Sequence, residues 1–157
     1  MVELRLGSRK TETRVSGIDM NKDVVIQAVK QVSAKFQWVK DRRIYIGDTW
    51  SVLDTSHNRI FGDCDNFTLT CLWLICKQSI WLFIWNVLVL HKYRIYYCRT
   101  SIGEPHVVGY AEGLWFDNFS KEALPEHEFF NETKHKKYFF YPSVLTAWYM
   151  LLGKIFD

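Results

Sequence analysis

The stretch from Gly62 to Lys77 reads GDCDNFTLTCLWLICK and decides the fold of the chain. A glycine-aspartate turn leads into an apolar run, and the carboxylate of Asp63 can cap the first backbone N–H groups of a helix. Three residues recur at the spacing of one helix face: Phe67, Cys71 and Leu74. We therefore predict a helix from Cys64 to about Lys77, apolar nearly all round and central to the domain.

Hydrophobic spacing predicts further elements on both sides of this helix. An amphipathic helix is expected from Asp19 to about Lys40, with Asn21 or Asp19 as its N-cap and apolar positions continuing through Phe36 and Val39. Residues 41–63 are expected to be irregular. Residues 80–90 are compatible with a helix or a buried strand.

The second half of the chain reads first as strands. They are expected at residues 92–99, 106–110 and 114–117, the last two forming a hairpin around residues 111–113. Residues 119–141 are polar and turn-rich. A closing helix over residues 143–153 is expected to face inward with Val144, Trp148 and Leu151 or Leu152. Helices and an antiparallel sheet together predict an α+β fold.

Length and composition bound the protein class. With 157 residues, 48% hydrophobic and 24% charged, the chain fits one globular domain over residues 1–157, with residues 1–18 as a loose arm. The 20 Lys+Arg and 17 Asp+Glu give a net charge of +3 with scattered basic residues, which predicts no nucleic-acid partner. The most apolar window, residues 80–90, is far shorter than the about 20 residues of a membrane span, so no membrane partner is expected.

The N-terminus and the cysteines indicate the compartment. No apolar signal core follows Met1, so a cytoplasmic protein is expected. The four cysteines are Cys64, Cys71, Cys76 and Cys98. In a cytoplasmic chain they predict no disulfide framework, and the last three are expected to pack in the core.

Cys64 differs from the other cysteines because it opens the central helix, where the macrodipole favours a thiolate. The neighbouring Asp63 and Asp65 oppose that thiolate, so a cationic partner is required. A hairpin turn centred between residues 111 and 112 would pair residues whose numbers sum to 223, and so would set His106 opposite Asp117. That pair is expected to supply the partner.

Four short motifs occur in order along the chain: Asp48-Thr49-Trp50, Gly62-Asp63-Cys64-Asp65-Asn66-Phe67, His106-Val107-Val108 and Leu114-Trp115-Phe116-Asp117-Asn118. Their order and spacing resemble the bacterial transglutaminase-like cysteine proteinases of the transglutaminase/papain-like superfamily. The resemblance covers roughly residues 22–120 and leaves residues 119–157 as an unmatched extension. The chain departs from the family pattern at Asn66, where the family usually has an acid.

The resemblance implies a papain-like core and a cysteine peptidase or amidase that acts on a protein or peptide. Cys64 would be the nucleophile and its backbone N–H an oxyanion donor, His106 the general base and acid, and Asp117 the group that orients the imidazole. Trp50 would line the site, unless it is a core plug. No cofactor is required.

Some family members bind calcium beside the nucleophile, at positions matched here by Asp63 and Asp65. Two acids are few for a cation that takes six to eight oxygens, and capping of the helix by Asp63 is the simpler explanation. His127 and His135 lie in a charged loop, where no metal site is expected.

Alternative functions remain open at this point. A non-catalytic binding protein could retain the fold, and a transamidase or deamidase of protein glutamine would use the same three residues. We further hypothesise a bacteriophage-encoded protein that modifies a host or viral protein in the cytoplasm.

Overall fold

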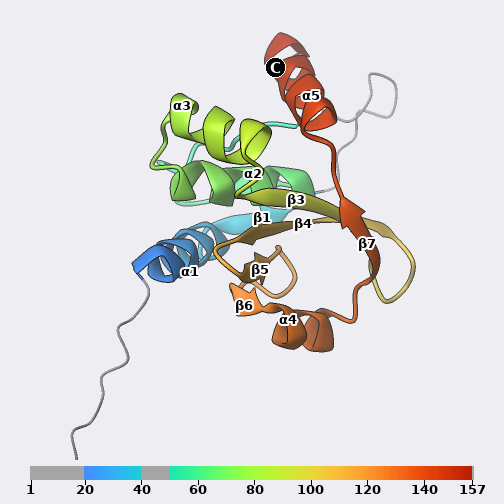
Figure 1. The fold of residues 1–157 in the computed structure, drawn as a ribbon. Coiled ribbons are helices and arrows are strands. Elements are labelled where there is room, and N and C mark those ends of the chain that lie inside the picture. The colour runs from blue at the N-terminus through green and yellow to red at the C-terminus, as the bar shows by residue number, and fades with distance from the viewer. Residues whose placement is uncertain (1–19, 40–49, 157) are drawn as a thin grey trace, which may run out of the picture.

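The computed structural model describes residues 20–39 and 50–156. Its centre is a five-stranded antiparallel sheet in the order β6-β5-β4-β3-β7 (Figure 1). The strands are β3 (Arg94–Arg99), β4 (Pro105–Ala111), β5 (Leu114–Phe116), β6 (Leu124–Pro125) and β7 (Lys136–Phe140). The mixed α+β architecture is as the sequence predicts.

The central helix is α2 (Cys64–Ile75), close to its expected bounds. Its N-cap is Asp63, whose carboxylate accepts the backbone N–H of Asn66, while the Asn66 side chain accepts the backbone N–H of Asp63. This reciprocal capping box fixes where the helix begins. The helix packs between α1 (Met20–Ser33) and β4, and buries Phe67 completely.

The first helix is shorter than expected. It ends at Ser33, and Phe36 lies instead in β1 (Phe36–Trp38), which pairs in parallel with β2 (Ile60–Gly62). The Phe36 ring still packs edge-on against Phe67, with ring centroids 5.0 Å apart. Apolar spacing predicted a longer helix because a strand that follows on the same side of the core continues the pattern.

Of the two N-caps proposed for this helix, Asn21 is wrong because it lies inside α1, and Asp19 stays a prediction because it lies outside the described residues. Residues 1–18, Lys40 and residues 41–49 of the segment expected to be irregular also lie outside them.

The ambiguous apolar segment is helical. It forms α3 (Ile80–Phe83), capped by the Ser79 side chain, and continues as the π-helical η1 (Ile84–Val89). Within it only Phe83 and Val87 are buried. No single helix of the described ranges has the length and apolar composition to cross a membrane; α2 and residues 80–89 reach them only together, as a pair bent by 112°.

The hairpin forms, but its register differs from the expected one. The turn is Glu112-Gly113, with φ angles of 50° and 83°, and Tyr110 pairs with Trp115, so paired numbers sum to 225 rather than 223. A two-residue turn with positive φ at both central residues matches the twist of the two strands that it joins. A shift of two residues keeps each side chain on its predicted face.

The chain after residue 118 is more ordered than expected. It supplies β6, α4 (Glu126–Thr133), β7 and α5 (Ser143–Phe156), and β6 and β7 are the two outer strands of the sheet. The closing helix also faces the opposite way: Val144 is 80% exposed, Trp148 55% and Leu151 50%, while Thr146 is buried. Periodicity identified the apolar side of α5 but not whether that side meets the core.

Candidate active site

Cys64 is the first residue of α2 and is half-buried. It packs at the margin of the main hydrophobic core, which also holds Phe67 and Val107. Its place at the helix N-terminus is the one predicted from sequence, and the macrodipole there favours a thiolate.

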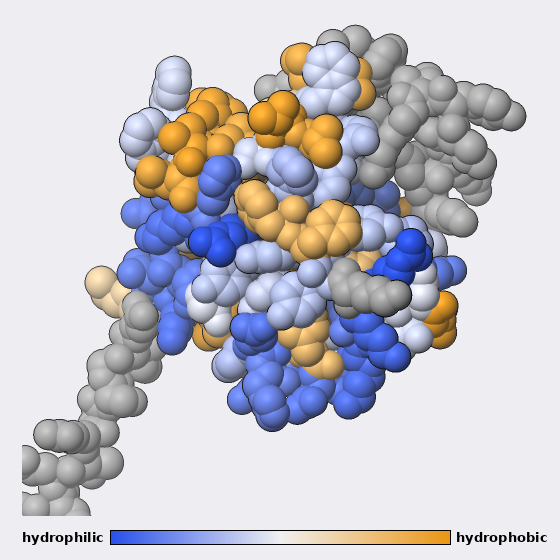
Figure 2. Space-filling view, turned by 45° about the vertical axis from the view of Figure 1, so that its right-hand side comes forward, coloured by the Kyte–Doolittle hydropathy of each residue, from blue (hydrophilic) through white to orange (hydrophobic). Residues whose placement is uncertain are grey.

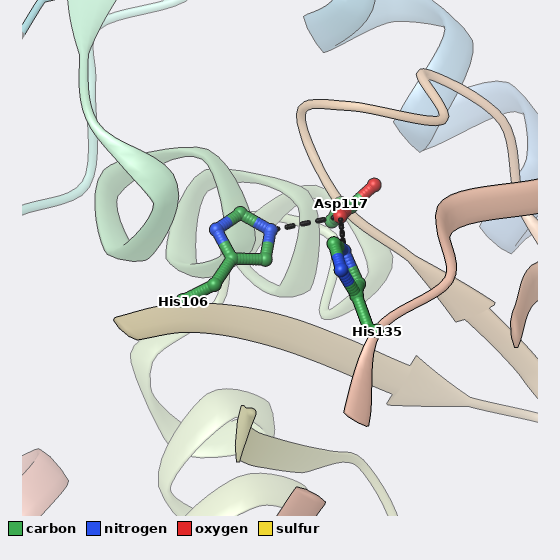
Figure 3. A group of neighbouring side chains, drawn as sticks. All are labelled: His106, Asp117 and His135. Atoms are coloured by element: carbon green, nitrogen blue, oxygen red, sulfur yellow. Dashed lines mark hydrogen bonds and ion pairs between the residues drawn. The ribbon is translucent and has the colours of Figure 1, made fainter. Parts of the chain in front are cut away.

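His106 and Asp117 are brought together. His106 stands near the start of β4, Asp117 directly follows β5, and His106 Nε2 lies 2.8 Å from Asp117 Oδ2 (Figure 3). Both side chains are buried. The register makes them diagonal rather than opposite neighbours, a separation that an imidazole and a carboxylate can span. Since Nε2 faces the carboxylate, His106 would present Nδ1 to a reacting group.

A second histidine shares this carboxylate. His135 Nε2 lies 2.7 Å from the same Asp117 Oδ2, and Figure 3 shows the two imidazoles approaching Asp117 from different sides. His135 lies between α4 and β7, and its ring is packed near those of Phe119 and Phe129. The expected loop position between charged residues is confirmed for His135, which lies between Lys134 and Lys136 but is buried, and is wrong for His127, which lies in α4. The strand β7 was missed in the sequence analysis, and the β-favouring aromatic residues Tyr138-Phe139-Phe140 are the signal that could have indicated it.

Asp117 is held as an anion. Burial opposes its ionisation, but the hydrogen bonds from His106 and His135 outweigh burial, so the pKa of Asp117 lies well below its ordinary value. Its other oxygen, Oδ1, accepts the backbone N–H groups of Phe119 and Ser120 at 3.1 and 2.8 Å. Each carboxylate oxygen therefore has two hydrogen-bond donors.

Two residues of the predicted triad are joined by a hydrogen bond, His106 and Asp117. The role of Cys64 as their nucleophile stays a prediction. α2 packs directly against β4, the strand that carries His106.

The other cysteines are structural. Cys71, Cys76 and Cys98 are buried, and none of the four forms a disulfide. Burial raises the pKa of the Cys71 thiol well above its ordinary value, that of Cys76 to about 11 and that of Cys98 to about 12.

Trp50 is 1% exposed, and its ring packs against those of Tyr141 and Tyr149, with centroids 4.8 and 5.5 Å away. This is the packing role of a core plug. Lining of the site by Trp50 stays a prediction, and Asp48 lies outside the described residues.

One of the two positions matched to calcium ligands has another role. Asp63 caps α2, as the simpler interpretation predicted, and Asp65 is buried. Asn66, which departs from the family pattern, completes the capping box and donates to the Ser51 carbonyl at 3.1 Å. Calcium binding at Asp63 and Asp65 stays a prediction.

His106, Asp117 and His135 themselves could converge on a metal ion, since one ligand atom from each lies within 4.8 Å of the others. Two observations favour a hydrogen-bonded cluster instead. Asp117 already accepts two donors on each oxygen. His135 Nδ1 is buried with no hydrogen-bond partner among the described residues, whereas a metal-bound imidazole almost always donates its other N–H.

A scan of the chain against protein-family models finds no match, and a search of curated proteins finds no significant match.

Proposed function

We propose that the chain is a cysteine peptidase or amidase of transglutaminase-like type, in which Cys64, His106 and Asp117 act together. The observation that carries the proposal is the buried His106–Asp117 pair, in which the carboxylate takes Nε2 and leaves Nδ1 for a nucleophile. The half-buried thiol at the start of α2 supports it, because α2 packs on the strand that carries His106.

In the proposed reaction, the Cys64 thiolate attacks an amide carbonyl while His106 holds the thiol proton. His106 then protonates the departing amine, and the acyl group stays on sulfur as a thioester. Water, activated by His106, hydrolyses the thioester and restores the thiol. Asp117 stabilises the imidazolium in both steps and stays ionised, which agrees with its lowered pKa.

His135 enters the proposal as a positioning residue. Its hydrogen bond to Asp117 Oδ2 fixes the carboxylate that in turn fixes His106. Because the two imidazoles compete for one oxygen, His135 also sets how much of the negative charge acts on His106.

The first test is the rate of Cys64 alkylation by iodoacetamide across pH 5 to 9, located by mass spectrometry. In the wild type we expect the Cys64 thiol to react at pH values well below the pKa of an ordinary cysteine, which is about 8.5. The His106→Ala variant should lose that reactivity. Cys64→Ser is the control for the assigned site. Equal pH profiles for the wild type and His106→Ala would contradict the proposal and favour the alternative of a non-catalytic binding protein.

Transfer to amines is tested separately. A labelled primary amine that becomes incorporated into a protein substrate would identify transamidation, whereas release of new N-termini would identify peptidase activity.

A further inference from the structure

One end of the molecule exposes an unusual amount of apolar surface. Figure 2 shows hydrophobic side chains gathered at its upper end, over α3, η1 and α5, and hydrophilic ones gathered at the lower end. η1 contacts α5, so these helices form one surface, which we call the apolar face. Its most prominent residues are Trp81 (78% exposed), Trp85 (56%), Leu90 (54%), Val144 (80%), Trp148 (55%) and Leu151 (50%). Contiguous apolar surface of this kind marks an interaction site.

The chain segments that supply the apolar face carry charges of one sign. Two segments of the chain, residues 66–103 and 133–156, contain none of the 17 acidic residues and eight of the 20 Lys and Arg residues. They include most of α2 and the whole of α3, η1, β3, β7 and α5. Lys77 and Arg94, just before and after the α3–η1 segment, are exposed. Lys92 Nζ forms an ion pair with Glu112 Oε1 at 2.7 Å, and Glu112 belongs to the turn between β4 and β5.

We propose that the apolar face binds the surface of an anionic lipid bilayer. Tryptophan favours the boundary between headgroups and acyl chains, leucine and valine enter the acyl region, and the flanking cations meet lipid phosphates. The absence of acids over two separate segments complements an anionic surface. A second copy of the chain would set the same cations against one another, so charge disfavours a homodimer through this face.

This inference is independent of the chemistry of Cys64. It also replaces the expectation of no membrane partner, which rested on the length of a spanning segment. Helices that lie in the interface need an apolar side rather than a spanning length. The outward apolar side of α5, which sequence spacing assigned to the core, provides such a side.

The test is sedimentation of the full chain with vesicles of phosphatidylcholine, alone and mixed with phosphatidylserine. We expect binding to the mixed vesicles that weakens with added salt, and much weaker binding to phosphatidylcholine alone. The double variant Trp81→Ser/Trp85→Ser should lower the partition coefficient at least about tenfold. Trp38→Ser removes a tryptophan of similar exposure (57%) from β1, outside the apolar face, and should bind like the wild type.

A second measurement needs no variant. Bromine on the lipid acyl chains should quench part of the wild-type tryptophan fluorescence when the vesicles are anionic. The proposal is overturned if the chain sediments with neither vesicle, if Trp38→Ser loses as much binding as the double variant, or if bromolipids quench nothing. It is also overturned if the double variant abolishes self-association while vesicle binding is absent, because the occupant is then a second copy.

Discussion

At the residue scale, Asp117 connects the parts of the candidate site, since its carboxylate accepts hydrogen bonds from two imidazoles and two backbone N–H groups. Its pKa is lower in the folded protein than in the unfolded chain, where it is about 3.9. The carboxylate therefore stabilises the fold fully at pH values above about 3.9, and this contribution is lost as pH falls from there through the pKa of the folded protein.

We expect Asp117→Asn to lower the free energy of unfolding by about 3 kcal/mol at pH 7. The difference from the wild type should begin to shrink below about pH 4, the pKa of the unfolded carboxyl, and should go on shrinking as pH falls further. Urea denaturation at pH 7 and pH 3 measures both values. Asp54→Asn, which changes an exposed carboxylate, should behave nearly as the wild type. A pH-independent difference would contradict the role of the buried anion.

His135 gives the second prediction at this scale. His135→Phe keeps a ring in the aromatic pocket but removes the donor to Asp117, and should slow Cys64 alkylation near pH 7 roughly tenfold, the factor expected for one charge-assisted hydrogen bond. His135→Gln retains an N–H donor and should stay within about threefold of the wild type.

The pH profile of alkylation separates positioning from structure. It should change in the phenylalanine variant and be recovered in the glutamine variant, while equal melting temperatures confirm that both fold. If both variants keep the wild-type profile but His106→Ala loses it, the role given to His135 is wrong and the proposed triad stands.

At the element scale, the β4–β5 pair depends on one close contact. A Cβ added to Gly109 would lie 2.3 Å from a ring atom of the fully buried Phe116, its partner across the strands. The glycine therefore lets the Phe116 ring cross β4 and fixes the end of β5, from which Asp117 emerges. Here a missing side chain positions a functional one.

We expect Gly109→Ala to destabilise the protein by about 2 kcal/mol, because the new methyl group overpacks the core. Phe116→Leu added to it should recover part of that loss, since the smaller side chain vacates the space. Thermal unfolding of the two single variants and the double variant measures the coupling. Additive losses would show that the contact between positions 109 and 116 is not the cause.

At the scale of the whole molecule, the fold sorts four cysteines into two kinds. Cys71, Cys76 and Cys98 are at most 2% exposed, whereas Cys64 is half-buried at a helix terminus. We expect Ellman's reagent to modify one thiol quickly in the native protein and all four in urea, with native modification of the other three limited by unfolding. Fast modification of a second native thiol would contradict this packing.

The sequence by itself determined the central helix with its cap, the α+β class, the three central strands of the sheet and the closeness of His106 and Asp117. These features depend on local signals: a capping residue, a turn, and the alternation of side chains between the two faces of a strand. A register error of two residues leaves that alternation unchanged. The tertiary structure alone decided the pairing of β1 with β2, the outward apolar side of α5 and the arrival of His135 at Asp117. The first and the last of these join segments far apart in the chain. For α5, local periodicity gives the apolar side of the helix without saying what that side meets.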